Sequence, residues 1–106
     1  MLVYISGPYT SKTLRGVQQN IELASNLAYK YWMKGYTVIC PHKNTAFFDG
    51  DDNTELWQNG DLEILSKCDI IVMMKNWTDS KGAKIEYQYA KELGKKIIFD
   101  GLENDN

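Results

Sequence analysis

Residues 61–94 read DLEILSKCDIIVMMKNWTDSKGAKIEYQYAKELG, and this stretch decides the fold. Its centre, Asp69–Met74, is nearly all apolar, which is typical of a parallel strand covered on both faces. After a polar turn, Asp79 and Ser80 offer side chains that can cap a new helix, which we expect from Lys81 to Leu93. The stretch therefore predicts a helix, a buried strand, a turn and a second helix.

The last of these helices carries a carboxylate beside a glycine. With Ser80 as the cap, Glu86 lies one turn beyond Gly82 and leans back over it, because helical side chains tilt toward the N-terminus. Glycine inside a helix costs on the order of 1 kcal/mol relative to alanine, which indicates that the space above Gly82 is kept free for something flat. Glu86 falls between the apolar and charged faces of the helix, so a solvated glutamate and a catalytic one both stay open.

The rest of the chain alternates between strands and helices. Apolar periodicity and turn residues place the elements at Leu2–Ile5 (strand), Val17–Lys34 (helix, ended by Gly35), Tyr36–Cys40 (strand), Thr54–Lys67 (helix, with a weak point at Asn59–Gly60) and Lys96–Phe99 (strand). Residues 9–16 and 42–53 are expected to be polar loops. This order predicts an α/β fold, an open parallel sheet with helices on both faces. We expect a single domain over residues 1–100 and a flexible acidic tail over residues 101–106.

Polar and small residues follow each of the first three predicted strands. They are Ser6, Gly7, Pro8 and Tyr9 after the first strand, His42 after the second, and Asn76 and Ser80 after the third. Ligands of open parallel sheets sit beyond the carboxyl ends of the strands. The sequence therefore predicts a pocket at this edge of the sheet.

Asp61, on the second helix, is either a surface carboxylate or a partner of Glu86. Two carboxyl groups that converge on one pocket can act as nucleophile and acid, as glycosyl-transfer chemistry requires. On the first strand, Tyr4 is either a core tyrosine or a member of the same site.

Composition and charge exclude several classes of partner. The 12 basic and 14 acidic residues give a net charge of -2 with no basic cluster, so no nucleic-acid polymer is expected. Two widely spaced cysteines, no basic leader and no apolar run of roughly 20 residues indicate a cytoplasmic protein without a membrane partner. His42 is the only histidine, and no ligand spacing predicts a metal. Aromatic residues make up 12% of the chain, enough for a subunit interface or a ring-binding pocket.

Together these residues resemble a known family. The matching motifs are YISGP at 4–8, GYTV at 35–38 leading to Pro41, CDIIVMM at 68–74, Trp77, SKGAKIE at 80–86, and Ala90. The chain is similar, up to about Phe99, to the nucleoside 2-deoxyribosyltransferase-like superfamily. Its small phage-type members and the 2′-deoxynucleoside 5′-monophosphate N-hydrolase branch are the most similar. The resemblance implies a Rossmann- or flavodoxin-like open parallel sheet of four to five strands.

The resemblance also implies roles for individual residues. Glu86 matches the nucleophile that attacks the anomeric carbon of deoxyribose, Asp61 the carboxyl group that helps the base depart, and Tyr4 the tyrosine that holds the glutamate. Ser80 matches a serine that binds the 5′-phosphate in the monophosphate hydrolases. That branch carries further phosphate-binding serine and arginine residues after the first strand, where this chain has other residue types.

The expected function is hydrolysis or transfer at the N-glycosidic bond of a 2′-deoxynucleoside or its 5′-monophosphate. The residues expected to contact substrate are Ser6, Gly7, Pro8, Tyr9, His42, Asn76, Ser80 and Gly82. No cofactor or metal is implied, the partner is a small nucleoside or nucleotide, and a homodimer or larger homo-oligomer is expected. The alternative is a protein that binds a nucleotide or a nucleotide-derived signal without turning it over.

Overall fold

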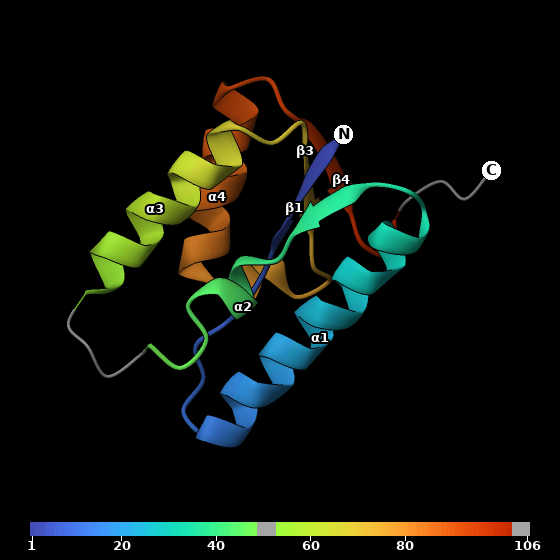
Figure 1. Ribbon diagram of the computed structural model, residues 1–106. Coiled ribbons are helices and arrows are strands. Elements are labelled where there is room, and N and C mark those ends of the chain that lie inside the picture. The colour runs from blue at the N-terminus through green and yellow to red at the C-terminus, as the bar shows by residue number, and fades with distance from the viewer. Residues whose placement is uncertain (49–52, 103–106) are drawn as a thin grey trace.

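The computed structural model describes residues 1–48 and 53–102 (Figure 1). Its elements, in chain order, are β1 (Leu2–Ser6), α1 (Leu14–Met33), β2 (Thr37–Ile39), α2 (Pro41–Asn44), α3 (Thr54–Ser66), β3 (Ile70–Met73), the 3₁₀ turn η1 (Trp77–Asp79), α4 (Lys81–Glu92) and β4 (Lys96–Phe99). The predicted succession of strands and long helices is confirmed, with boundaries that differ by a few residues. Part of the predicted polar loop, residues 49–52, and most of the predicted tail, residues 103–106, lie outside the described residues.

The strands form one parallel sheet in the order β2-β1-β3-β4. The chain runs outward from β1 to β2 and then returns to the other side of β1 to form β3. The direction of the connections therefore reverses between β1 and β3, the switch point where open α/β sheets bind ligands. Figure 1 shows α1 on one side of the sheet and α3 with α4 on the other, which confirms the open, flavodoxin-like α/β arrangement.

Alternate residues of β1 belong to different layers of the core. Val3 and Ile5 pack into the apolar cluster that includes the buried side of α1, whereas Tyr4 packs into the cluster that includes Ala83 and Ala90 of α4. Successive side chains of a strand point to opposite faces of the sheet. Ser6 is two residues beyond Tyr4, so both hydroxyl groups face α4.

Helix ends match the sequence signals in three places. The hydroxyl of Ser80 accepts the N–H of Ala83 at 3.0 Å and caps α4, as predicted. Gly35 and Gly94 follow α1 and α4 with φ values of +95° and +71°, a conformation that favours glycine.

Local structure differs from the predictions at other positions. The hydroxyl of Thr13 accepts the N–H of Gly16 at 2.9 Å, so α1 begins at Leu14, inside the predicted loop. The short helix α2 also replaces the start of a predicted loop, because Pro41 occupies its first position with φ already suited to a helix. The predicted weak point at Asn59–Gly60 leaves α3 unbroken.

The segment after β4 is ordered further than predicted. The N–H of Asp100 donates to the carbonyl of Met73 at 2.8 Å, and that of Leu102 to Phe99 at 3.0 Å. Asp100 and Gly101 therefore form a turn bonded to the sheet. Across residues 1–48 and 53–102, no helix combines the length and apolar character needed to cross a membrane.

The turn after β1 passes close to the end of β3. A Cβ added to Gly7 would lie 2.3 Å from the sulfur and 2.7 Å from the Cβ of Met74, which is buried. Close packing of this kind places the turn, and with it one wall of the cavity described below, against the sheet.

We expect Gly7→Ala to lower the free energy of unfolding by about 1–3 kcal/mol, because the added methyl group overpacks against Met74. Gly60→Ala is the matched control. Gly60 lies in α3 with nothing within 4 Å of an added Cβ, so alanine should raise the unfolding free energy by up to about 1 kcal/mol. Urea titrations of both variants measure the two changes, and equal effects would contradict the close packing of the Gly7 turn.

Candidate functional site

A cavity of about 800 Å³ opens at the carboxyl ends of β1 and β3. The turn after β1, the helices α2 and α3, and the N-terminal part of α4 form its walls, and α2 and the start of α4 lie at this end of the sheet in Figure 1. The lining residues are Ile5, Gly7, Pro8, Tyr9, Thr10, Pro41, His42, Thr45, Thr54, Glu55, Trp57, Gln58, Asp61, Asp79, Ser80, Lys81, Gly82, Ala83, Ile85 and Glu86. The pocket thus lies where the strand ends and their polar residues predicted it.

Glu86 is the buried carboxylate of this cavity. It lies on the buried side of α4 between Ala83 and Ala90, and it is 8% exposed. The two alanines are short, so this side of α4 packs closely on the sheet. The carboxylate then meets β1: Tyr4 donates its hydroxyl to Oε2 at 2.7 Å, and Ser6 donates to Oε1 at 2.6 Å.

The charge on Glu86 is set by two opposing effects. The pKa of Glu86 lies above its ordinary value, because burial raises it by more than the hydrogen bonds from Ser6, Tyr4 and Gln58 lower it by stabilising the carboxylate. Burial and the charge of Glu86 raise the pKa of Tyr4 well above its ordinary value. The phenol therefore keeps its proton and remains a donor to Glu86.

Asp61 lines the same cavity from α3. Burial, followed by the negative charge of Glu86, raises the pKa of Asp61 from 3.8 to about 7. Across residues 1–48 and 53–102, no side chain donates a hydrogen bond to Asp61, while Glu86 receives three. The three donors stabilise the charged form of Glu86, whereas Asp61 keeps its proton up to near neutral pH.

The segment after β1 is held from two sides. Nε2 of His42 lies 3.1 Å from the carbonyl oxygens of both Gly7 and Pro8, and since carbonyls only accept, this nitrogen carries the proton. Burial lowers the pKa of His42, so the ring is neutral. From the other side, Nδ2 of Asn20 donates to the carbonyl of Tyr9 at 3.0 Å.

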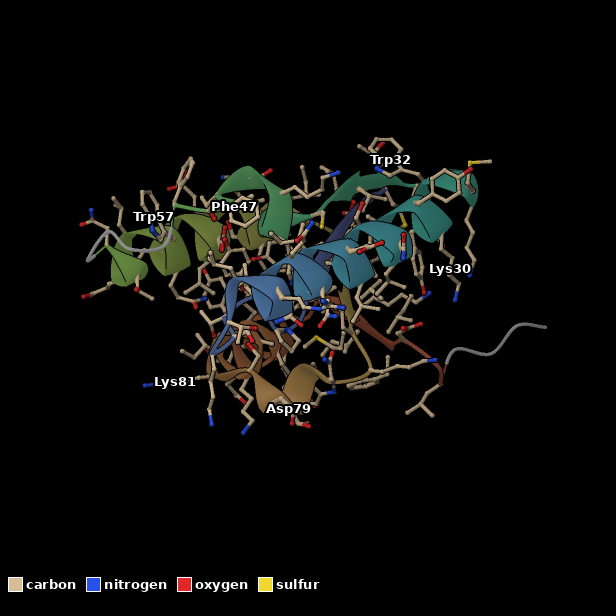
Figure 2. All side chains as sticks on the ribbon, turned by 90° about the horizontal axis from the view of Figure 1, so that it is seen from below. Lys30, Trp32, Phe47, Trp57, Asp79 and Lys81 are labelled. Carbon is tan, nitrogen blue, oxygen red and sulfur yellow. The ribbon has the colours of Figure 1, made fainter. Side chains whose placement is uncertain are left out.

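Aromatic side chains form the wall near the start of α3. Trp57 lines the cavity, and Phe48 lies edge-on to it with ring centroids 5.3 Å apart. Figure 2 shows Phe47 and Trp57 at one end of the molecule, away from Lys30 and Trp32. The indole N–H of Trp57 is buried without an acceptor in the described part of the chain, at a cost of about 1–3 kcal/mol.

The structure divides the residues that the sequence singled out into three groups. Those lining the cavity are Gly7, Pro8, Tyr9, His42, Asp61, Ser80, Gly82 and Glu86. Tyr4 and Ser6 are fully buried and contact Glu86 instead of the open cavity. Asn76 does not line the cavity; it precedes η1, where its carbonyl accepts the N–H of Asp79 at 3.0 Å.

Sequence reasoning missed Gln58 and Trp57. A usable signal was present, because these residues precede Asp61 by three and four positions on one helix and therefore share its side. In the described residues, no group of three or more histidine, cysteine, aspartate or glutamate side chains could hold a metal ion.

Comparisons with known proteins place the chain in a family and a fold. The model of the family described as "Domain of unknown function (DUF4406)" matches residues 1–99. No protein in a search of curated proteins matches the chain. Among solved structures, a 2-deoxyribosyltransferase from the psychrotolerant bacterium Bacillus psychrosaccharolyticus aligns with a TM-score of 0.60 at 22% identity, over 100% of this chain and 77% of that chain. At this identity the likeness shows the fold, and the expected resemblance to 2-deoxyribosyltransferases is confirmed at that level.

We expect Asp61→Asn to raise the melting temperature relative to wild type at about pH 8 and to change it little at about pH 4. A carboxyl group with a raised pKa stabilises the fold while protonated, so its contribution is full below the ordinary value of 3.8 and is lost as the pH rises through about 7. Asparagine does not ionise, so the variant does not lose this stability as the pH rises. Thermal melts of both proteins across this pH range measure the difference.

The control is Glu63→Gln, which removes an exposed carboxylate from the same helix. Its melting temperature should follow that of wild type at every pH. If the difference in melting temperature between Asp61→Asn and wild type does not grow with pH, the raised pKa of Asp61 is contradicted.

Proposed function

This chain belongs to the DUF4406 family, and we propose that it is an enzyme that breaks the bond between base and sugar in a 2′-deoxynucleoside or its 5′-monophosphate. Glu86 is the nucleophile, and hydrolysis or transfer to a second base completes the reaction. The substrate is a small molecule, and the reaction requires neither metal nor organic cofactor.

One observation carries the proposal: two carboxyl groups in different environments line one cavity. Glu86 is buried, and its carboxylate accepts hydrogen bonds from two hydroxyl groups of a central strand. Asp61 keeps its proton up to about pH 7. A carboxylate beside a protonated carboxyl group is the pair that cleavage of a glycosidic bond uses as nucleophile and acid.

The reaction follows from this pair. One oxygen of Glu86 bonds to the anomeric carbon while the bond from that carbon to the base breaks, and the bonding electrons leave with the base. Asp61 gives its proton to the departing base, and the sugar remains as an ester of Glu86. Asp61, now ionised, takes a proton from water or from a second base, which attacks the anomeric carbon and restores the Glu86 carboxylate. Tyr4 and Ser6 keep the carboxylate in place throughout.

Two features of the cavity support a nucleotide substrate. Trp57 and Tyr9 supply aromatic rings that a flat base can pack against. At the opposite wall, Ser80 and Lys81 begin α4, whose first N–H groups have no partner within the helix and favour an anion such as a 5′-phosphate.

This chain differs from the monophosphate hydrolases at positions where that branch is expected to bind the 5′-phosphate. Pro8 and Thr10 stand where the resemblance implies further phosphate-binding serine and arginine residues. A free nucleoside therefore belongs in every assay beside its monophosphate. The competing function is a pocket that binds a nucleotide without turnover, which the same cavity would also fit.

We expect the wild-type protein to release free base from members of a panel of 2′-deoxynucleosides and their 5′-monophosphates. Glu86→Gln removes the nucleophile while keeping its size, and it should lower base release by about 10³-fold or more. Glu92→Gln, an exposed glutamate on the same helix, should match wild type. Mass spectrometry of the products gives the readout, and a new nucleoside formed after adding a second base identifies transfer.

Other outcomes separate the alternatives. Equal base release by wild type and Glu86→Gln would show that Glu86 is not the nucleophile. If neither protein releases base while nucleotide raises the melting temperature of both, the binding function replaces the enzyme. If neither activity nor thermal shift occurs, both functions are wrong.

We also propose that the chain forms a homodimer or a larger homo-oligomer. What supports this is an exposed apolar side of α1, where Tyr29, Trp32 and Met33 are 66%, 50% and 69% exposed. These residues are three and four positions apart and share one side of the helix, and Figure 2 shows Trp32 far from Trp57 of the cavity. Such surfaces mark protein interfaces.

We expect sedimentation of the wild-type protein at micromolar concentration to show a species larger than a monomer. Trp32→Glu places a charge at the centre of the exposed apolar side and should weaken association by about 30-fold or more, the effect of losing an interface hot spot. Lys43→Glu, on α2, is a control that should sediment like wild type. A monomer at every concentration would contradict self-association.

A further inference from the structure

Gln58 fills the space above Gly82. Its side-chain oxygen Oε1 lies 2.9 Å from the position that a Cβ on Gly82 would take, and both residues line the cavity. The amide is flat, and the absence of a side chain on Gly82 lets it lie against the first turn of α4. The sequence predicted that the space above Gly82 is free for something flat, and the amide of Gln58 lies in this space.

The same amide reaches Glu86. Nε2 of Gln58 lies 3.5 Å from Oε2 of Glu86, the oxygen that already accepts the 2.7 Å hydrogen bond from Tyr4. Ser6 bonds the other oxygen at 2.6 Å. The contact from Gln58 is the longest of the three and lies beyond the range of about 2.7–3.2 Å that is usual for an N–H···O bond, so it is the weakest.

The three donors also differ in how freely they move. Tyr4 and Ser6 are fully buried in the central strand, whereas Gln58 is half-buried on α3 and has a long side chain with several rotatable bonds. A sugar that approaches Glu86 over Gly82 therefore meets Gln58 and not the hydroxyl groups. Gln58 has the weakest bond and the most rotatable side chain of the three donors, so it is the donor that a sugar displaces most easily.

We propose that Gln58 is a positioning residue that holds the Glu86 carboxylate in the empty cavity, covers Gly82, and is displaced when the substrate enters. Its place on α3, three residues before Asp61, puts both groups on the side of the helix that faces Glu86. The displacement by substrate rests on the proposed function. The contacts of Gln58 with Gly82 and Glu86 do not depend on the proposed function.

The contact with Gly82 is tested by stability, without activity. A helix is more stable with alanine than with glycine at an interior position, so Gly82→Ala should raise the melting temperature when nothing lies above it. When Gln58 is present, the new methyl group pushes its amide away, so the melting temperature rises by less. In a Gln58→Ala background the full gain should appear. An equal effect of Gly82→Ala in both backgrounds would overturn the placement of Gln58 over Gly82.

The contact with Glu86 is tested by titration. Gln58→Met keeps the length of the side chain and removes the amide donor, so the pKa of Glu86 should rise, as observed by carbon-13 NMR of the glutamate carboxyl group in the ligand-free protein. Gln88→Met, on the exposed side of α4 where Gln88 donates to Glu92, is the matched control and should leave the titration of Glu86 unchanged. No difference between the two variants would overturn the positioning role.

Displacement is tested by the kinetics of a turned-over deoxynucleoside or deoxynucleotide. We expect Gln58→Met to leave kcat unchanged, because the amide has already left Glu86 when substrate is bound. KM should fall by about three- to tenfold, because substrate no longer has to displace a bonded amide. A raised KM with unchanged kcat would show that Gln58 binds substrate directly and would overturn displacement. If no substrate is turned over, the proposed function fails while the stability and titration tests still decide the two contacts.

Discussion

The carboxylate of Glu86, held between the hydroxyl groups of Tyr4 and Ser6, is the interaction on which the rest of the site depends. A buried charge costs several kcal/mol unless hydrogen bonds compensate it. The compensation comes from β1, which lies between β2 and β3 inside the sheet. Alternation along this strand places both hydroxyl groups on the face toward α4, and two alanines bring α4 close enough to meet them. The carboxylate is thereby bonded to an interior strand of the sheet.

Two other groups near Glu86 come from α3 and are more exposed than Tyr4 and Ser6. Asp61 and Gln58 project from α3, and both are only half-buried. Burial and the nearby charge raise the pKa of Asp61 to about 7, which lowers stability at high pH and leaves a proton available near neutral pH. A fixed carboxylate from α4 thus faces groups on α3 that can exchange protons or move. The proposed bond cleavage needs such a division, since the attacking atom must stay in place while the other groups respond to the substrate.

The fold and the chemistry of this chain depend on different features. A TM-score of 0.60 at 22% identity to a 2-deoxyribosyltransferase shows that the two chains share a fold. A shared fold hosts many functions, so the chemistry has to be argued from the side chains in the cavity. Tyr4, Ser6, Asp61 and Glu86 all lie within residues 1–99, the part of the chain that matches the DUF4406 family.

The sequence by itself determined the order of the elements, the parallel sheet and the edge where the cavity opens, because these follow from apolar periodicity and caps such as Ser80 and Gly94, which act over a few residues. Tertiary structure alone decided that Gln58 covers Gly82 and that Ser6 bonds Glu86 instead of lining the cavity. The partners in these contacts are 24 and 80 positions apart in the chain, so no local pattern records them. They arise when the sheet order brings β1 beside α4, and α3 packs against α4 over the end of the sheet.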